Sequence, residues 1–312
     1  MAFFHLDEQL QCLIDQILAQ VWNQFPALAR NQIALTWIVY DPPVMVNTGG
    51  ALNPNEFWQH APRGATYRGL ELIYPASIVK LFYLIAAHEW LDKGMSQSSP
   101  ELERAMRDMI VDSSNDATSL VVDVLTGTTS GPELSPGPLQ TWQYQRNLVN
   151  RYLQSLQWPE FEMINVNQKT WSEGAYGRER IFLGEFMENR NMLSTDATAR
   201  LLHSIIGGVA VSSGRSQTMM NLMKRSLDPQ VLATDPENQV VEFLGEGLPQ
   251  NAQIWSKAGL TSKVRHDAAY IELSGTRPYL LVVFTEGKTQ SQNKELLPFI
   301  SSQIVAAVEE LK

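Results

Sequence analysis

The sequence has few of the residues that build disulfides or metal sites. Its only cysteine is Cys12, so no disulfide can form within the chain. Its five histidines are scattered singly, without an H-E-x-x-H pattern or a cysteine–histidine cluster. No apolar run approaches the roughly 18 residues that a membrane-spanning helix needs. We therefore expect a globular fold with no metal, no cofactor and no membrane span.

Positive charge is also scarce. The chain has 33 acidic and 24 basic residues and a formal net charge of -9, without a local basic cluster. Such a surface repels phosphate groups, so nucleic acid is not an expected partner. The 312 residues, of which 44% are hydrophobic, are enough to bury a core.

The first 30 residues do not resemble an export signal. Asp7, Glu8 and Asp15 interrupt an apolar periodicity that predicts an amphipathic helix, and no basic segment precedes a continuous apolar one. For the chain as it stands we expect a cytoplasmic location. If a leader had been removed, the location would be periplasmic or secreted.

Strand signals appear near both ends of the chain and helical signals fill the middle. Residues 33–40 are β-branched and aromatic and predict a buried strand that ends at Asp41-Pro42-Pro43. Residues 44–75 look loop-like, with Gly49-Gly50 among them. From Ser77 to about Leu227 the apolar spacing is helical, except in the Gly-, Pro- and Ser-rich residues 127–140, where no packed element is expected.

Three more strands are predicted at 253–257, 268–273 and 278–285, and a last helix at about 296–311. These elements favour an α+β fold. Residues 1–75 and 245–312 would form an α/β lobe, with one antiparallel sheet flanked by the terminal helices, and residues 76–244 an inserted all-α lobe. The crevice between the two lobes is the expected place for a substrate.

Ser77 and Lys80 form an S-x-x-K motif at the start of a strongly apolar helix. Three residues apart on a helix, the two side chains are neighbours. Burial would lower the lysine pKa, so that a neutral amine could accept the serine proton, and unpaired amides of the first turn could bind an oxyanion. Taken alone, the motif equally fits a serine helix cap and a lysine that reaches solvent.

The chain contains a second S-x-x-K, Ser291 to Lys294, in a polar turn before the last helix. Nothing there would remove solvent from the lysine. The apolar surroundings, and not the pattern, favour Ser77 and Lys80.

Two further motifs follow along the chain. Ser113-Ser114-Asn115 precedes an apolar run, where a hydroxyl could pass a proton to a leaving group and an amide could bind an acyl amide; such residues are also ordinary helix caps. Lys257-Ala258-Gly259 ends a predicted strand, where a lysine could attract a carboxylate and a glycine allows a substrate backbone to approach; edge-strand lysines are also often simply solvated.

In this order and setting, the three motifs resemble those of the serine β-lactamase and penicillin-binding family, including its class A β-lactamases. The resemblance spans most of the chain. It implies that Ser77 attacks an acyl carbon, that Lys80 is its base, and that Ser113 with Asn115 serves as proton shuttle and amide anchor. No cofactor is implied.

The resemblance also assigns roles to the late strand. Lys257 would supply positive charge across the site, and Gly259 would leave room for the substrate. The backbone N–H groups of Ser77 and Leu260 would form the oxyanion hole.

The chain departs from the family in two places near these motifs. The segment between Ser77 and Ser113 is short, so a loop that walls one side of the cleft is missing. Ala258 stands where relatives that bind the penicillin carboxylate have a hydroxyl. Candidates to replace that hydroxyl are Thr261, Ser262 and Arg265.

The deacylating glutamate of β-lactamases has no E-x-x-L-N motif here. Glu173, Glu179 and Glu185 lie in the corresponding stretch, and Glu179 has the family's approximate spacing to the next helix. We therefore predict Glu179 as the base. The alternative is an exposed loop carboxylate paired with Arg178 or Arg180.

The resulting hypothesis is a β-lactamase-type serine hydrolase that acts on a small-molecule or peptide-like amide. The alternatives on the same fold are a D-alanyl peptidase, an esterase, a glutaminase, or a non-catalytic protein that binds peptidoglycan fragments or a protein partner.

Overall fold

The computed structural model describes residues 2–41 and 52–311. The predicted turn at Pro42-Pro43 and the Gly49-Gly50 part of the expected loop lie outside the described residues. Within the described part, no helix is both long and apolar enough to cross a membrane.

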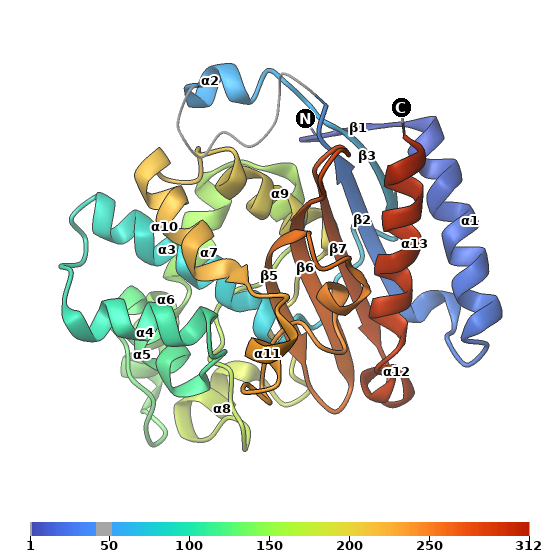
Figure 1. The fold of residues 1–312 in the computed structure, drawn as a ribbon. Coiled ribbons are helices and arrows are strands. Elements are labelled where there is room, and N and C mark those ends of the chain that lie inside the picture. Colours follow the sequence, from blue (N-terminus) through green and yellow to red (C-terminus); the bar gives the residue numbers. More distant parts are fainter. Residues whose placement is uncertain (1, 42–51, 312) are drawn as a thin grey trace.

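A mixed seven-stranded sheet runs through the middle of the molecule in the order β1-β3-β2-β7-β6-β5-β4 (Figure 1). All neighbouring strands pair antiparallel except β1 and β3. The strands are β1 (His5–Leu6), β2 (Ile33–Val39), β3 (Arg63–Tyr67), β4 (Lys224–Arg225), β5 (Gln253–Leu260), β6 (Val264–Glu272) and β7 (Tyr279–Glu286).

The four strands expected from the sequence, β2, β5, β6 and β7, are present and lie in one antiparallel sheet, which confirms the predicted fold class. Three shorter strands were missed. β3 lies within the segment expected to be loop, β1 precedes the first helix, and β4 is a short strand inside the segment expected to be all-helical.

The terminal helices α1 (Glu8–Gln24) and α13 (Leu296–Glu310) pack side by side on one face of the sheet, as Figure 1 shows. The side chain of Asp7 caps α1 by accepting a hydrogen bond from the amide of Leu10. The core on this face combines apolar residues of both helices with alternate residues of the strands, such as Leu35 and Trp37 of β2. Every residue of β2 is buried, because helices cover both faces.

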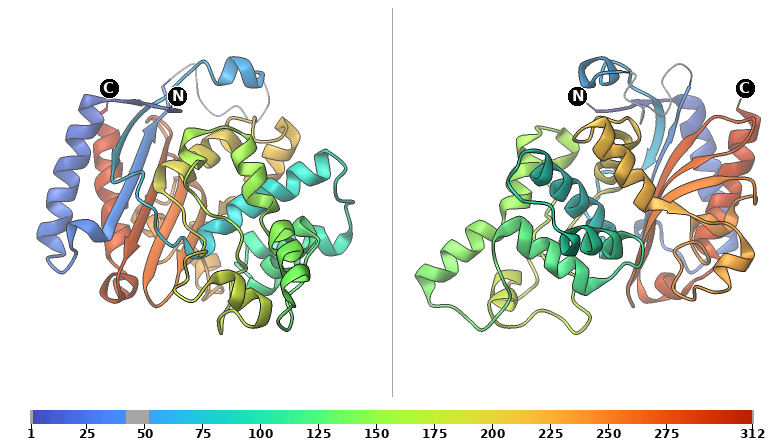
Figure 2. Two further views of the ribbon diagram at one scale, coloured as in Figure 1. Left: turned by 180° about the vertical axis from the view of Figure 1, so that it is seen from behind. Right: turned by 60° about the vertical axis from the view of Figure 1, so that its left-hand side comes forward.

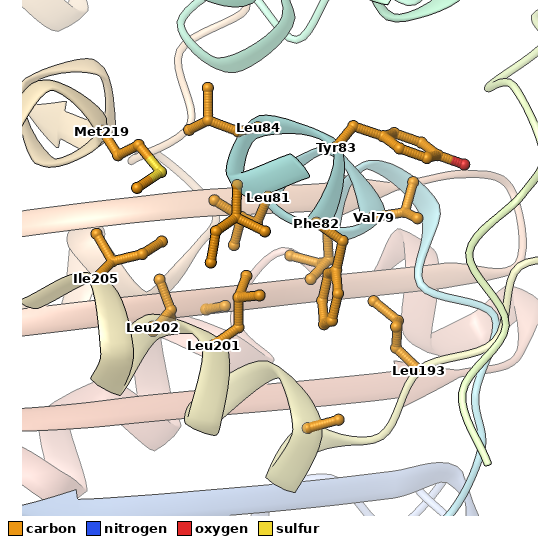
Figure 3. Close-up of a cluster of buried hydrophobic side chains, with 14 of the residues drawn as sticks. Val79, Leu81, Phe82, Tyr83, Leu84, Leu193, Leu201, Leu202, Ile205 and Met219 are labelled. Atoms are coloured by element: carbon orange, nitrogen blue, oxygen red, sulfur yellow. The ribbon is translucent and has the colours of Figure 1, made fainter. Parts of the chain in front are cut away.

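The other face of the sheet is covered by the helical segment (Figure 2). Its centre is α3 (Val79–Asp92), which is apolar nearly all around, as expected of a helix surrounded by others. Side chains of α3 meet those of α9 (Thr195–Ile206) and Met219 in a cluster of buried hydrophobic residues (Figure 3). This packing holds the beginning of α3 against the sheet.

The remaining helices surround α3 or lie in connections: α2 (Pro54–Phe57), α4 (Pro100–Ile110), α5 (Asn115–Thr126), α6 (Pro136–Arg146), α7 (Leu148–Ser155), α8 (Gly177–Leu183), α10 (Ser213–Met223), α11 (Pro229–Leu232) and α12 (Lys288–Gln292). The expectation that residues 127–140 contain no packed element is wrong for residues 136–140, which belong to α6. Pro136 occupies the first turn of α6, where proline needs no amide hydrogen.

Candidate active site

Ser77 lies in the 3-10 turn Ala76–Ile78, directly before α3. The preceding residue, Ala76, has a left-handed backbone with φ 48°, which is unfavourable for a residue with a side chain. Ser77 itself is half-buried. Among the described residues its hydroxyl has no hydrogen-bond partner, so it is available to a substrate.

Lys80 lies one turn further along and is fully buried. Burial lowers its pKa to about 7, because the charged form loses its solvation. Its Nζ lies 2.5 Å from the Ser113 carbonyl oxygen, 3.0 Å from Asn115 Oδ1 and 3.3 Å from Ser113 Oγ. Both protonation states of Lys80 are therefore accessible near neutral pH.

Ser113 and Asn115 lie at the turn between α4 and α5, and Ser114 caps α5 through the amide of Ala117. Ser113 has φ 55°, again in the left-handed region. This backbone directs both its carbonyl oxygen and its hydroxyl to the lysines. The prediction that the S-x-N motif sits at a helix start is confirmed, and it is Ser114, the middle residue, that makes the cap.

Lys257 approaches Ser113 from β5. It is fully buried, and its Nζ donates to Ser113 Oγ (2.9 Å), Gln239 Oε1 (2.5 Å) and the Ala258 carbonyl oxygen (2.8 Å). Burial, together with the charges of Lys80 and Arg225, holds the pKa of Lys257 well below its usual range. Lys257 is therefore not a solvated lysine on an edge strand. Ser113 Oγ accepts hydrogen bonds from both Lys257 and Lys80.

Gly259 brings β5 against the nucleophile turn. A Cβ atom at this position would lie 2.8 Å from the Pro75 carbonyl oxygen and 3.3 Å from the Ser77 amide nitrogen. Only glycine permits this approach without displacement of the turn. Leu260, the next residue, ends β5 beside Ser77.

A pocket of about 650 Å³ opens in front of these groups. Its lining includes five of the predicted site residues, Ser77, Ser113, Asn115, Lys257 and Leu260. Lys80 and Gly259 lie behind them. The structure therefore brings seven of the eight predicted site residues, from three separate parts of the chain, to one place.

The family model described as "Beta-lactamase enzyme family" matches residues 94–308. The chain belongs to this β-lactamase family. The matched range contains Ser113, Asn115 and Lys257 but begins after Ser77 and Lys80, so the nucleophile assignment depends on the geometry above. The comparison with curated proteins gave no significant match.

Solved structures of the same fold extend over nearly the whole chain. A β-lactamase from Sphaerobacter thermophilus is 17% identical, with a TM-score of 0.63 and coverage of 96% of this chain and 98% of that one. A mutant of PBP-A, solved as an acyl-enzyme complex with penicillin G, is 17% identical, with a TM-score of 0.65 and coverage of 97% and 98%. A mutant of the class A β-lactamase of the last common ancestor of Gram-negative bacteria is 16% identical, with a TM-score of 0.61 and coverage of 96% and 100%.

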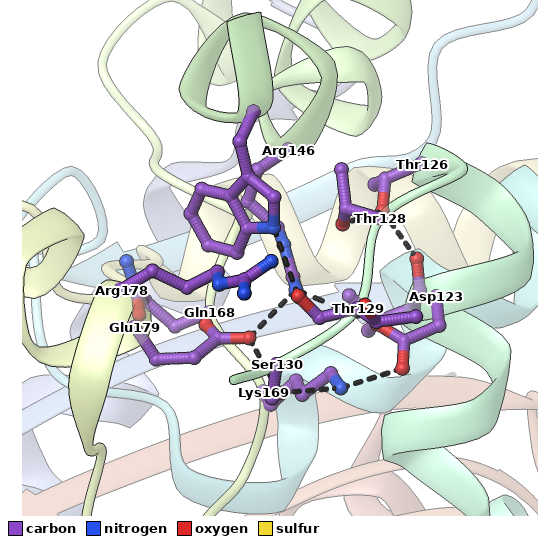
Figure 4. A network of polar contacts seen from close by, with 12 residues as sticks. Asp123, Thr126, Thr128, Thr129, Ser130, Arg146, Gln168, Lys169, Arg178 and Glu179 are labelled. Atoms are coloured by element: carbon purple, nitrogen blue, oxygen red, sulfur yellow. Dashed lines mark hydrogen bonds and ion pairs between the residues drawn. The ribbon is translucent and has the colours of Figure 1, made fainter. Parts of the chain in front are cut away.

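Glu179, the eighth predicted site residue, lies elsewhere in this β-lactamase-family protein. It is fully buried on α8, and its Oε1 accepts from Arg146 at 2.6 Å and from Ser130 at 2.7 Å (Figure 4). It does not line the pocket in the described part of the chain. The alternative expectation, an exposed carboxylate paired with Arg178 or Arg180, is wrong.

The same network continues to Lys169, whose Nζ donates to Asp123 Oδ2 at 2.7 Å and to Ser130 Oγ at 2.8 Å (Figure 4). It ties the segment that follows Lys169 to α5 and α6. From this segment, Ser172 Oγ accepts a hydrogen bond of 3.3 Å from the Asn115 amide. The network thus anchors the segment that reaches the pocket.

Sequence reasoning missed Gln239. This buried side chain accepts hydrogen bonds from Lys257 Nζ and the Ala258 amide, and it donates to the carbonyl oxygens of Ile110 and Val111. It joins β5 to the end of α4, next to Ser113. Its polar surroundings in the sequence gave no sign of this role.

The remaining candidates lie apart from the nucleophile. Arg265 donates to the Ser291 carbonyl oxygen and forms an ion pair with Glu242, so it does not supply a free cation to the pocket. Lys294, of the second S-x-x-K, is exposed and pairs with Glu242, which confirms that its surroundings do not remove solvent from it.

A second pocket, of about 540 Å³, contains none of the predicted site residues. Phe4, Leu70 and Asp196 are among its lining. The chemistry described above is confined to the pocket in front of Ser77.

Proposed function

We propose that this protein is a serine hydrolase of the β-lactamase type that cleaves an amide through an acyl-enzyme on Ser77. The observation that supports this most is the position of Lys80. A buried lysine with a pKa of about 7 lies one turn after a half-buried serine, in contact with a second serine at the same pocket. A perturbed pKa beside hydroxyl groups in a pocket is typical of a catalytic site.

In the acylation step, neutral Lys80 takes the proton of Ser77 while Oγ bonds to the acyl carbon. The backbone N–H groups of Ser77 and Leu260 stabilise the negative charge on the carbonyl oxygen, and each donor of this kind contributes about 3 kcal/mol to transition-state binding. The C–N bond then breaks. The proton reaches the leaving nitrogen from Lys80 by way of the Ser113 hydroxyl, which lies 3.3 Å from Lys80 Nζ.

In deacylation, water adds to the acyl carbon, the ester C–O bond to Ser77 breaks, and the carboxylic acid leaves. A proton of the water returns to Ser77 Oγ, which restores the free enzyme. Glu179 remains a prediction for the base of this step; its contacts with Arg146 and Ser130, away from the pocket lining, favour a structural role. Asn115, which contacts both Lys80 and Ser172, is positioned to bind the acyl amide.

The test is covalent labelling followed by intact-protein mass spectrometry. An uncharged acyl-serine probe and a fluorescent penicillin are each incubated with the protein and with Ser77→Ala. We expect a mass increase with the uncharged probe that is absent in Ser77→Ala. Lys80→Met, which keeps the fold's apolar packing, should slow labelling about a hundredfold or more.

Labelling that persists in Ser77→Ala would refute the nucleophile assignment. If no probe labels the parent protein while a ligand still binds it, the protein is a non-catalytic binding member of the family. Turnover of nitrocefin, D-alanyl peptides, simple esters and glutamine then separates the enzymatic activities that this fold supports.

A further inference from the structure

The charged residues that line the pocket are mostly acidic. Asp112, Asp235, Glu237 and Glu242 line it, against the single ammonium of Lys257. Three of them, Asp112, Asp235 and Glu237, are exposed at its edge. Asp112 forms an ion pair with Arg107 at 3.5 Å, whereas Asp235 and Glu237 have no ion-pair partner among the described residues. A ligand that carries a negative charge would enter against their field.

Lys257 has no free N–H group with which to bind an anionic ligand against the negative field of these carboxylates. An ammonium group has three N–H bonds, and Lys257 Nζ has three acceptors within 2.9 Å: Ser113 Oγ, Gln239 Oε1 and the Ala258 carbonyl oxygen. Burial also lowers the pKa of Lys257, which disfavours its charged form. A substrate carboxylate could bind it only by displacing one of these partners.

The two nearby arginines are occupied as well. Arg225 donates to the carbonyl oxygens of Ile110, Val111 and Ser256. Arg265 is held by Glu242 and Ser291. Neither lines the pocket in the described part of the chain.

Ala258, the residue after Lys257, provides no side-chain group that could bind an anion. Ala258 lines the pocket and has no hydroxyl, so it cannot donate a side-chain hydrogen bond to a carboxylate. The pocket therefore offers an anion neither a free cation nor a side-chain hydroxyl at position 258.

We propose that the pocket selects acyl substrates that are uncharged or carry an ammonium group, and discriminates against carboxylate-bearing ones such as ordinary penicillins. The inference rests on the proposed acyl-serine chemistry and names its substrate class. At roughly 8 Å in a water-like dielectric, one carboxylate changes the binding of a unit charge about twofold. The two exposed carboxylates without an ion-pair partner, Asp235 and Glu237, thus amount to about fivefold at low ionic strength.

The experiment uses three activated esters with the same acyl chain, ending in a methyl, an ammonium or a carboxylate group. The acylation rate of Ser77 is measured for each by mass spectrometry at low salt. We expect the carboxylate ester to react about fivefold more slowly than the methyl ester, and the ammonium ester at least as fast as the methyl ester. The differences should shrink in 0.5 M salt, because salt screens the charges at the pocket edge. This concentration is about five times the ionic strength at which the Debye length is about 10 Å, so the field of the carboxylates reaches less far.

Removal of two edge charges provides the second measurement. In Asp235→Asn/Glu237→Gln, the ratio of carboxylate-ester to methyl-ester rates should rise about fivefold at low salt. The matched control is Glu309→Gln/Glu310→Gln, which makes the same change in net charge at exposed positions of α13, on the other side of the sheet. The control should leave the ratio unchanged.

Equal rates for the methyl and carboxylate esters in the parent protein would overturn the charge preference and leave the serine chemistry intact. A ratio that rises equally in the control variant would also overturn it, since net charge and not the pocket edge would be the cause. If no ester acylates the protein, the proposed function fails, and the preference falls with it.

Discussion

Replacing Arg146 by methionine tests whether Glu179 belongs to a structural ion pair. Both side chains are fully buried, and Arg146 lies 4.6 Å from the centroid of the Trp142 ring. Without the guanidinium, Glu179 keeps only the Ser130 hydroxyl as a hydrogen-bond donor to its carboxylate within the described residues. Leaving a buried charge unpaired costs about 3–5 kcal/mol, so we expect Arg146→Met to lower the free energy of unfolding by that amount.

The double variant Arg146→Met/Glu179→Leu should recover most of this loss. Arg146 Nε and Nη1 and Glu179 Oε2 have no partners in the described part of the chain, so the pair is incompletely satisfied where it is. Replacing such a pair by apolar side chains is often neutral or stabilising. We expect the double variant to lie within about 1 kcal/mol of the parent protein.

The assay is urea unfolding of the four proteins in the double-mutant cycle, followed by circular dichroism. Glu179→Leu alone should also lower the free energy of unfolding, because it leaves the buried guanidinium of Arg146 with Asp123, at 3.4 Å, as its remaining ion-pair partner within the described residues. The reasoning would be refuted if the two single changes were additive in the double variant, since additive losses mean that the two charges do not interact.

Four further outcomes follow from the site. Glu179→Gln keeps an oxygen acceptor for Arg146 and Ser130, so the acyl-enzyme lifetime should change by less than about threefold; a lifetime about a hundredfold longer would restore Glu179 as the deacylating base. The acylation rate should rise about tenfold per pH unit below pH 7 and level off above it, because the neutral form of Lys80 accumulates through its pKa of about 7; a pH-independent rate contradicts Lys80 as base. Gly259→Val places carbon 2.8 Å from the Pro75 carbonyl oxygen and should abolish labelling of Ser77, whereas unchanged labelling would show that β5 need not approach the turn. Gln239→Leu removes a hydrogen-bond partner of two donors, on Lys257 and Ala258, and of the carbonyl oxygens at 110 and 111, and should lower the unfolding free energy by about 2–5 kcal/mol in a urea titration. A change below about 1 kcal/mol would mean that Lys257 finds another acceptor.

The parts of this fold that the sequence predicted are those with strong local signals. β2 and β7 are rich in β-branched and aromatic residues because both of their faces are buried. By contrast, β3 has the sequence Arg-Gly-Ala-Thr-Tyr, which contains no apolar run. It is a strand because β2 supplies its hydrogen-bond partners, and that information is not local.

The site shows the same division. Ser77 and Lys80 could be recognised because the apolar residues around them predicted a buried lysine. Glu179 was placed on a loop from spacing alone, whereas its position depends on Arg146, a residue 33 positions away in the chain. Gln239 contacts groups 18 to 129 positions away, and no local pattern announces such contacts.

Ser113 is the point at which the two buried lysines influence each other. Its hydroxyl oxygen lies 3.3 Å from Lys80 Nζ and 2.9 Å from Lys257 Nζ, and the charge of Lys80 is one cause of the lowered pKa of Lys257. When both lysines are charged, each donates to this oxygen, and the hydroxyl hydrogen must point elsewhere. When Lys80 is neutral, its lone pair can accept that hydrogen. The protonation state of Lys80 therefore sets the direction in which Ser113 donates, and a proton taken from Ser77 changes that direction toward the leaving group.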